Sequence, residues 1–294
     1  MTLYGIDISN NNSPALNLNQ VAQEGFSWVE AKVSEGNYFQ DTTWPGYLSA
    51  AQAAGLPIIG YHYAISSCTP ASQVQTFVGN GGGAQVMIDF EANSGTITDY
   101  WNLVDAFNSA GVGVALTYLP NWYWQQIGRP DLSQVPGLVA SDYPVSGSGY
   151  ASDLYGSAGG DAGPGWAAYG NGAPQIWQFT NSAAVAGESV DADAFRGTAG
   201  QLTDLLTGRT DMQLSDTLTD AYGNPLTVAD AFKWISYHAD LVVDGLGGIG
   251  SRQNLPPNQK NTGHPCLAGH DVVTALAAIG QKLGLAGFDP AQPE

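Results

Sequence analysis

Two kinds of residue are scarce in this sequence of 294 residues, and each shortage excludes a class of protein. The only cysteines are Cys68 and Cys266, far apart in the chain, so the sequence contains neither a disulfide framework nor a closely spaced cysteine pair for a metal. Lysine and arginine together number 8, against 26 aspartates and glutamates, which gives a formal net charge of −18. Because this charge repels phosphate backbones, we expect no nucleic acid partner.

Long apolar runs are missing as well. No stretch is long enough to cross a bilayer, so we expect no insertion into a membrane. The sequence begins Met-Thr-Leu-Tyr-Gly-Ile-Asp, without the basic segment and the apolar run that are typical of a signal peptide. These features predict a protein that is made in the cytoplasm.

The residues that are abundant favour an α/β fold. Hydrophobic residues make up 44% of the chain and glycine occurs 38 times, which is more glycine than a helical bundle tolerates. Short apolar runs alternate with helix-like segments as far as residue 205, as in parallel sheets that are buried on both faces. Strands are predicted over residues 3–8, 27–33, 56–63, 84–90, 112–118, 137–142, 174–179 and 189–191, and helices over 17–25, 44–54, 71–80, 98–110 and 122–127. This order predicts an incomplete (β/α) barrel of the TIM-like kind.

Two regions depart from the alternation of strands and helices. The Gly- and Ser-rich stretch 146–165 is predicted to be a long loop at the mouth of the barrel. After residue 207 the composition changes, so we expect a barrel domain over 1–207 and a small helical module over 208–294. The module shows two amphipathic helical patterns, over 227–244 and 271–284, and no convincing strand pair. Two helices bury little surface by themselves, so we expect this module to pack either on the barrel or on a second copy of itself. The second alternative would make the protein a homo-oligomer.

The most informative segment is the apolar run that ends in Asp89 and Glu91. In a strand, residues two positions apart face the same side, roughly 6.6 Å apart. At the carboxyl end of a barrel strand both carboxyls point into the mouth, where active sites of such barrels lie. Adjacent buried carboxyls raise the pKa of one member and supply a proton donor beside an ionised carboxylate, as glycoside hydrolysis requires.

Other charged residues follow strand-like runs in the same way. Asp7, Glu35 and Asp191 each come at the end of a predicted strand or directly after it, so several strands deliver acids to one rim. Lys32 lies inside an apolar strand and is predicted to act as a counter-charge among them.

In six segments the sequence resembles glycoside hydrolase family 25, the lysozymes (N-acetylmuramidases) that are common in phage endolysins. The resemblance covers residues 4–196, and the segments occur in the order in which the family has them. They are Gly5-Ile6-Asp7-Ile8-Ser9; Ala31-Lys32-Val33-Ser34-Glu35-Gly36 with Tyr38 and Asp41; Ala53-Ala54-Gly55-Leu56-Pro57-Ile58-Ile59-Gly60-Tyr61-His62-Tyr63; Ile88-Asp89-Phe90-Glu91; Ile176-Trp177-Gln178-Phe179-Thr180; and Gly187 with Val190-Asp191 and Phe195.

The resemblance implies an enzyme that cleaves the β-1,4 bond between N-acetylmuramic acid and N-acetylglucosamine in bacterial peptidoglycan, without a cofactor or a metal. Glu91 would be the general acid. Asp89 would act on the 2-acetamido group or on the developing oxocarbenium ion, and Asp7 and Asp191 would complete the catalytic set. The substrate-binding residues would be Tyr61, Lys32, Glu35, Tyr118, Trp177 and Gln178, with Trp177 as a platform for stacking on a sugar. Asp193 departs from the pattern, because the family more often has Asn there.

Three other interpretations remain open. A chitinase-like barrel also carries alternating acids on one strand, but its pattern has a further acid where this chain has Met87. A non-catalytic wall-binding virion module would not need Asp89 and Glu91. The segment His264-Pro-Cys266-Leu-Ala-Gly-His270 offers three metal ligands without a fourth. The preferred interpretation is a phage endolysin that accumulates in the host cytoplasm and acts on the wall after release.

Overall fold

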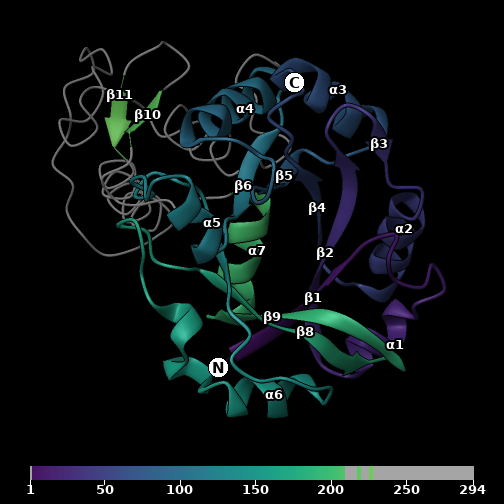
Figure 1. The fold of residues 1–294 in the computed structure, drawn as a ribbon. Helices are drawn as coiled ribbons and strands as arrows, with labels where there is room; N and C mark the ends of the chain where they lie inside the picture. Colours follow the sequence, from purple (N-terminus) through teal and green to yellow (C-terminus); the bar gives the residue numbers. More distant parts are fainter. Residues whose placement is uncertain (1, 209–216, 220–224, 228–294) are drawn as a thin grey trace, which may run out of the picture. The chain divides into compact units, whose positions relative to one another are not determined.

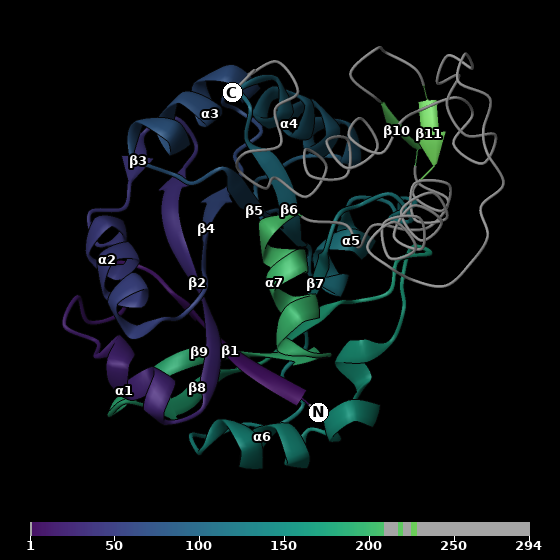
Figure 2. The same ribbon diagram turned by 180° about the vertical axis from the view of Figure 1, so that it is seen from behind.

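A computed structural model describes residues 2–208, 217–219 and 225–227 of the chain. The chain divides into two units, Met1–Arg209 and Thr210–Glu294. The first unit contains a nine-stranded sheet with the order β1-β9-β8-β7-β6-β5-β4-β2-β3. Because β1 also pairs with β2, the strands other than β3 form a closed barrel (Figures 1 and 2). The predicted TIM-like barrel is therefore confirmed.

Apart from the β2–β3 hairpin, the first unit alternates strands and helices as far as β7. The strands are β1 (Thr2–Ile8), β2 (Phe26–Glu35), β3 (Phe39–Gln40), β4 (Ile58–Tyr63), β5 (Gln85–Asp89), β6 (Gly113–Tyr118), β7 (Leu138–Ser141), β8 (Ile176–Val185) and β9 (Glu188–Arg196). The helices are α1 (Leu18–Gln23), α2 (Trp44–Ala54), α3 (Pro70–Gly79), α4 (Ile97–Ser109), α5 (Asn121–Gln126), α6 (Ala151–Ser157) and α7 (Ala199–Thr207), with short 3-10 turns at Gly160–Ala162 and Pro164–Trp166.

Two apolar layers result from the alternation of side chains along the strands. The outer layer lies between strands and helices and includes Val29, Phe77 and Phe107. The inner layer fills the barrel with residues such as Trp28 and Met87. Strand residues are thus apolar on both faces, which explains why the sequence shows continuous apolar runs rather than alternation.

Helix α7 covers the end of the barrel at which the parallel strands begin. Leu202 and Leu206 are buried and belong to the inner apolar layer. A Cβ at Gly208, just beyond the helix, would approach the side chain of Gln85, the first residue of β5. Thr198 and Gln201 form a capping box at the start of α7. With this end covered, the opposite end carries the accessible part of the interior.

The structure corrects three expectations. Residues 146–165 are not one long loop, because α6 and the 3-10 turns form there, and Leu154 and Tyr155 of α6 are buried in the outer layer. The last two barrel strands are longer than predicted and form a hairpin, with β9 antiparallel to both β8 and β1. The hairpin turns at Ala186 and Gly187, which both have positive φ.

The third correction concerns the second unit. Its described residues form two short antiparallel strands, β10 (Thr217–Thr219) and β11 (Pro225–Thr227), where the sequence predicted no strand pair. The predicted helix over 271–284 and nearly all of that over 227–244 lie outside the described residues, as do Cys266 and the two histidines beside it. No helix among the described residues is long and apolar enough to cross a membrane.

Candidate active site

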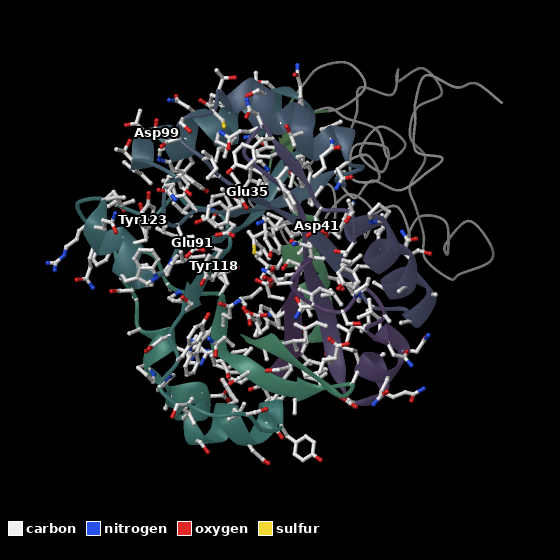
Figure 3. All side chains as sticks on the ribbon, turned by 45° about the vertical axis from the view of Figure 1, so that its right-hand side comes forward. Glu35, Asp41, Glu91, Asp99, Tyr118 and Tyr123 are labelled. Atoms are coloured by element: carbon white, nitrogen blue, oxygen red, sulfur yellow. The ribbon has the colours of Figure 1, made fainter. Side chains whose placement is uncertain are left out.

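An open pocket of about 650 Å³ occupies the end of the barrel at which the parallel strands finish. Seven of the ten predicted site residues line it, and each lies on a barrel strand or, for Glu91, directly after one. They are Asp7, Tyr61, Asp89, Glu91, Tyr118, Gln178 and Asp191. In Figure 3, Glu91 and Tyr118 lie beside one another within the ring of strands. The structure therefore brings residues from β1, β4, β5, β6, β8 and β9 together as the sequence predicted.

Asp89 and Glu91 both line this pocket, at the end of β5 and directly after it. Asp89 is 8% exposed, and its Oδ1 has no hydrogen-bond partner among the described residues. Burial and the nearby Glu91 raise the pKa of Asp89 well above its ordinary value. Burial also raises the pKa of Glu91, and the charge of Lys32 opposes that rise. The pair therefore retains a proton at a pH where ordinary carboxyls are ionised.

The loop after β5 fixes the backbone on which Glu91 lies. The Glu91 N–H donates to Ser94 Oγ at 3.0 Å, and Ser94 in turn donates to the carbonyl of Ala64 at 2.8 Å. The Tyr123 hydroxyl accepts from the N–H of Gly95 and donates to its carbonyl, each at 2.8 Å. The loop is thus attached on one side to Ala64, directly after β4, and on the other to α5, which restricts the directions in which the Glu91 side chain can point.

Asp7 faces the same pocket from β1 and is surrounded by acids. Burial raises its pKa well above the ordinary value, Asp191, Glu30 and Asp89 raise it further, and a hydrogen bond with Tyr61 lowers it. Burial also raises the pKa of Asp191 to about 6. A cleft with this many carboxyls stabilises positive charge that develops on a bound substrate.

Lys32 and Glu35 do not line the pocket, contrary to the prediction that both bind substrate. They form an ion pair with each other, with 2.6 Å between Lys32 Nζ and Glu35 Oε2. The Lys32 ammonium also lies 5.2 Å from the centre of the Tyr63 ring. Lys32 does lower the pKa of Asp89 and Glu91 by its charge, so its predicted place as a counter-charge fits the structure.

Trp177 is the clearest misplacement in the predicted site. Its side chain is 0% exposed, packs edge-on against Trp166 and donates to the carbonyl of Asp142 at 2.9 Å. Because neighbouring strand residues point to opposite faces, Gln178 faces the pocket while Trp177 faces the outer layer. A side chain that is fully covered by protein cannot stack on a sugar.

Two exposed aromatic residues that the sequence analysis did not select are better placed to stack on a sugar. Trp122, at the start of α5, and Tyr143, after β7, line the pocket and are 48% and 41% exposed. Both follow the carboxyl end of a strand within a few residues, which is the signal that could have identified them. Such rings are suited to stacking on the apolar faces of sugar rings.

Asp41 fixes a loop that contributes residues to the pocket. It is fully buried, and its Oδ2 accepts from the N–H of Asn10 at 2.8 Å. Its Oδ1 accepts from both the N–H and the hydroxyl of Thr43. Asn11 and Asn12, next to the bonded Asn10, line the pocket. Asp41 therefore holds the loop after β1 in position.

Among the described residues, no group of three or more His, Cys, Asp or Glu side chains has the geometry of a metal site. His62 is buried outside the barrel, between Ser34 and Gln73.

Comparison with known proteins agrees with this geometry. The model of Glycosyl hydrolases family 25 matches residues 6–188. No curated protein matches the chain significantly in sequence.

Several solved structures share the fold. A family GH25 lysozyme from Aspergillus fumigatus aligns with a TM-score of 0.57 and 23% identity, over 71% of this chain and 100% of that one. The bacterial lysozyme from Streptomyces coelicolor gives 0.57 and 20%, over 71% and 98%. The catalytic domain of endolysin ply40, from bacteriophage P40 of Listeria monocytogenes, gives 0.55 and 18%, over 70% and 98%.

The match to the family covers more than half of the chain, and it includes Asp7, Asp89 and Glu91. The chain therefore belongs to glycoside hydrolase family 25 and is a glycoside hydrolase.

Proposed function

We propose that this enzyme is a muramidase that hydrolyses the β-1,4 bond between N-acetylmuramic acid and N-acetylglucosamine in bacterial peptidoglycan. The observation that carries the proposal is the convergence of Asp7, Asp89, Glu91 and Asp191 on one open pocket of about 650 Å³. The solved structures of similar fold include lysozymes and muramidases of fungi and bacteria, which supports this substrate.

In the proposed reaction, Glu91 donates its proton to the glycosidic oxygen as the bond breaks. Glu91 is less buried than Asp89 and lies on the pocket wall, so it is the member of the pair that a leaving-group oxygen can reach. Asp89 faces the 2-acetamido group of the muramic acid from below, or the positive charge that develops at its anomeric carbon. Asp7 and Asp191 add negative charge on the other side of the pocket, where it favours the same transition state.

The other pocket residues bind and orient the glycan. Tyr61, Tyr118 and Gln178 present polar groups on the pocket wall, and Trp122 and Tyr143 present rings at its rim. The carboxyls and the substrate's own acetamido group suffice for this reaction, so the proposal includes no cofactor.

A chitinase-like activity is less well supported. Met87, two residues before Asp89 on β5, lines the floor of the pocket and is 1% exposed. The chitinase pattern has a carboxyl at this position, and this chain has a thioether. A non-catalytic wall-binding role is disfavoured because both Asp89 and Glu91 face the pocket.

The products distinguish these functions. Purified peptidoglycan is digested with the full chain, and the released fragments are reduced with borohydride and analysed by mass spectrometry. A muramidase leaves N-acetylmuramic acid at the reducing ends. Glucosamine at the reducing ends, or hydrolysis of chitin oligomers at a comparable rate, would refute the proposal.

We further propose that the enzyme acts as a phage endolysin, which accumulates in the host cytoplasm and reaches the wall after the membrane opens. The likeness to the Listeria phage endolysin domain supports this role. Expression in the cytoplasm of a bacterium whose wall the enzyme digests should leave the culture turbid until the membrane is permeabilised. Lysis without permeabilisation would show that the enzyme leaves the cell by another route.

For residues 208–294 we propose wall targeting or self-association. The apolar stripes of the two predicted helices support this proposal, since each is large for an exposed surface and small for an independent core. Several linked copies on one wall gain avidity even when each contact is weak.

A further inference from the structure

Two more carboxyls lie inside the barrel below the pocket, at Glu30 on β2 and Asp193 on β9. Their side chains are 1% and 0% exposed, and neither lines the pocket. Strand β1 lies between them, with Glu30 opposite Asp7 and Asp193 opposite Gly5 in the strand pairings. The two acids therefore flank the strand that carries Asp7.

Gly5 makes room for this arrangement. A Cβ at Gly5 would lie 2.1 Å from Cε2 of Trp28, so no other residue fits without moving the indole. The indole occupies the space over Gly5 and donates from Nε1 to Glu30 Oε1 at 3.0 Å. The Trp28 indole thus fills the interior space that a β1 side chain would otherwise take, next to Glu30.

Three carboxyl oxygens of this pair are buried without hydrogen-bond partners among the described residues, namely Glu30 Oε2 and both Asp193 oxygens. Within the same part of the chain, the only ion pair joins Lys32 to Glu35, so no cation neutralises the pair. Two ionised carboxylates in such a site are costly. A proton retained on one of them removes one of the two buried charges and so reduces this cost.

We propose that Glu30 and Asp193 share a proton and that this carboxyl pair is a positioning element, which sets the charge below Asp7 and hence the pH at which Asp7 changes its protonation. The shared proton is independent of the proposed function, whereas its effect on hydrolysis rests on that function.

The electrostatics of the interior support the pair. Burial raises the pKa of Glu30 to about 7, against the opposing hydrogen bond from Trp28. Burial raises the pKa of Asp193 well above its ordinary value, and Glu30 adds the next largest contribution. Glu30 also raises the pKa of Asp7. The other groups that face Asp7 are Asp191 on β9, Tyr61 on β4, Asp89 on β5 and Gln178 on β8.

The shared proton is tested by titrating the carboxyl carbons of the full chain by 13C NMR. The signals are assigned by their loss in Glu30→Gln and Asp193→Asn, both nearly isosteric. In the wild type the pair should titrate in two steps, one of them well above the ordinary range. Replacing Asp193 by Asn should lower the upper titration of Glu30 by more than about one pH unit, because the repelling partner is gone. An unchanged Glu30 titration overturns the proposal that Glu30 and Asp193 share a proton.

The reciprocal measurement, the titration of Asp193 in Glu30→Gln, gives the same test if one variant does not fold. Melting curves at low pH, where the carboxyls are neutral in both proteins, identify a variant that is damaged for other reasons. A titration that does not shift in either folded variant overturns the proposal.

The positioning role is tested by kcat/KM against pH with soluble peptidoglycan fragments. In Glu30→Gln one limb of the profile should move by about half a pH unit or more toward lower pH, because the carboxylate opposite Asp7 is gone and Asp7 ionises more easily. In Asp193→Asn the single negative charge of the pair lies wholly on Glu30, so this limb should not move toward lower pH. Asp105→Asn is the matched control, since Asp105 lies exposed on α4. An unchanged profile in a folded Glu30→Gln variant whose Asp193 titration has shifted overturns the role. A wild type without activity refutes the proposed function and leaves the NMR result to decide the pair.

Discussion

Gln178 donates a hydrogen bond from Nε2 to Asp7 Oδ2 at 3.2 Å, and this bond connects β8 to β1 past the intervening strand β9. The amide orientation is set by its other end, because Gln178 Oε1 accepts from the hydroxyls of Tyr118 and Tyr143. Two tyrosines thus determine that the amide nitrogen, and not the oxygen, faces Asp7. Gln178 is 2% exposed, so no solvent replaces these bonds.

Replacing Gln178 by Glu changes the size of the side chain little, and it should reduce kcat at least tenfold. The new carboxyl has no N–H for Asp7 and adds a like charge, which raises the pKa of Asp7 further. Gln178→Met is the matched control, since it removes the donor without adding charge. Hydrolysis by Gln178→Glu at the wild-type rate would show that the hydrogen bond to Asp7 has no part in catalysis.

Replacing Glu91 by Gln should abolish most hydrolysis while the protein stays folded, because the side chains are isosteric and only the proton donor is lost. General acid catalysis contributes typically 10²–10⁴-fold, and a loss of about that size is expected in kcat. Binding of peptidoglycan fragments, measured by calorimetry, should persist. Retention of more than about a tenth of the wild-type rate would remove Glu91 from the role of acid. Asp89→Asn should also cause a severe loss.

The barrel and the acids at its mouth could be predicted because each depends on a local pattern. The strands of the first half are buried on both faces, so they appear in the sequence as apolar runs, and polar residues follow where each run meets the mouth. Asp7, Asp89 and Glu91 mark such ends and all three line the pocket.

The remaining features could not be predicted, because they depend on which face of a strand points into the barrel and on contacts between residues that are far apart in the sequence. In a strand with two apolar faces, periodicity does not tell which face is inside the barrel, and Trp177 was therefore assigned to the pocket that its neighbour Gln178 occupies. The partnership of Glu30 with Asp193 joins strands from opposite ends of the barrel sequence. The short helix α6 is rich in small and polar residues and is held by contacts with β8 that the sequence does not reveal.

Trp177 and Trp122 should respond to truncation in opposite ways. Trp177→Ala empties a fully buried site and should lower the free energy of unfolding by about 3–5 kcal/mol. Trp122→Ala removes a ring that is 48% exposed at the pocket and should leave stability nearly unchanged while it raises KM. Urea unfolding and steady-state kinetics on both variants check the two expectations. An unstable Trp122 variant with normal KM would refute its role as a sugar platform.

His62 should limit stability on the acid side. Burial lowers its pKa from 6.5 to about 4, with Lys32 adding to the decrease and the hydrogen bond with Gln73 opposing it. The folded protein therefore binds this proton less readily than the unfolded chain, so the stabilisation is present above pH 6.5 and is lost as the pH falls toward 4. The shift corresponds to about 3 kcal/mol.

Replacing His62 by Gln, which has a similar size and no titrating group, should flatten this part of the stability curve. The free energy of unfolding in urea, measured at intervals from pH 7 to pH 4, provides the test. The wild type should lose more stability than the variant over that range. Parallel curves would show that His62 is not the group responsible.

A chain that ends after Gly208 should separate catalysis from the proposed role of the C-terminal residues. This endpoint keeps the last turn of α7 intact, because Gly208 adopts a left-handed conformation with φ 65° and its N–H caps the helix at the carbonyls of Asp204 and Leu205. It also keeps Leu202 and Leu206, which cover the lower end of the barrel. The shortened enzyme should therefore hydrolyse soluble peptidoglycan fragments at close to the full-length rate and bind intact walls more weakly.

Light scattering of both proteins distinguishes the two forms of the proposal, since self-association requires that the full-length mass exceed that of one chain and that the shortened enzyme be monomeric. Undiminished wall binding together with a monomeric mass in both proteins would refute targeting and self-association alike.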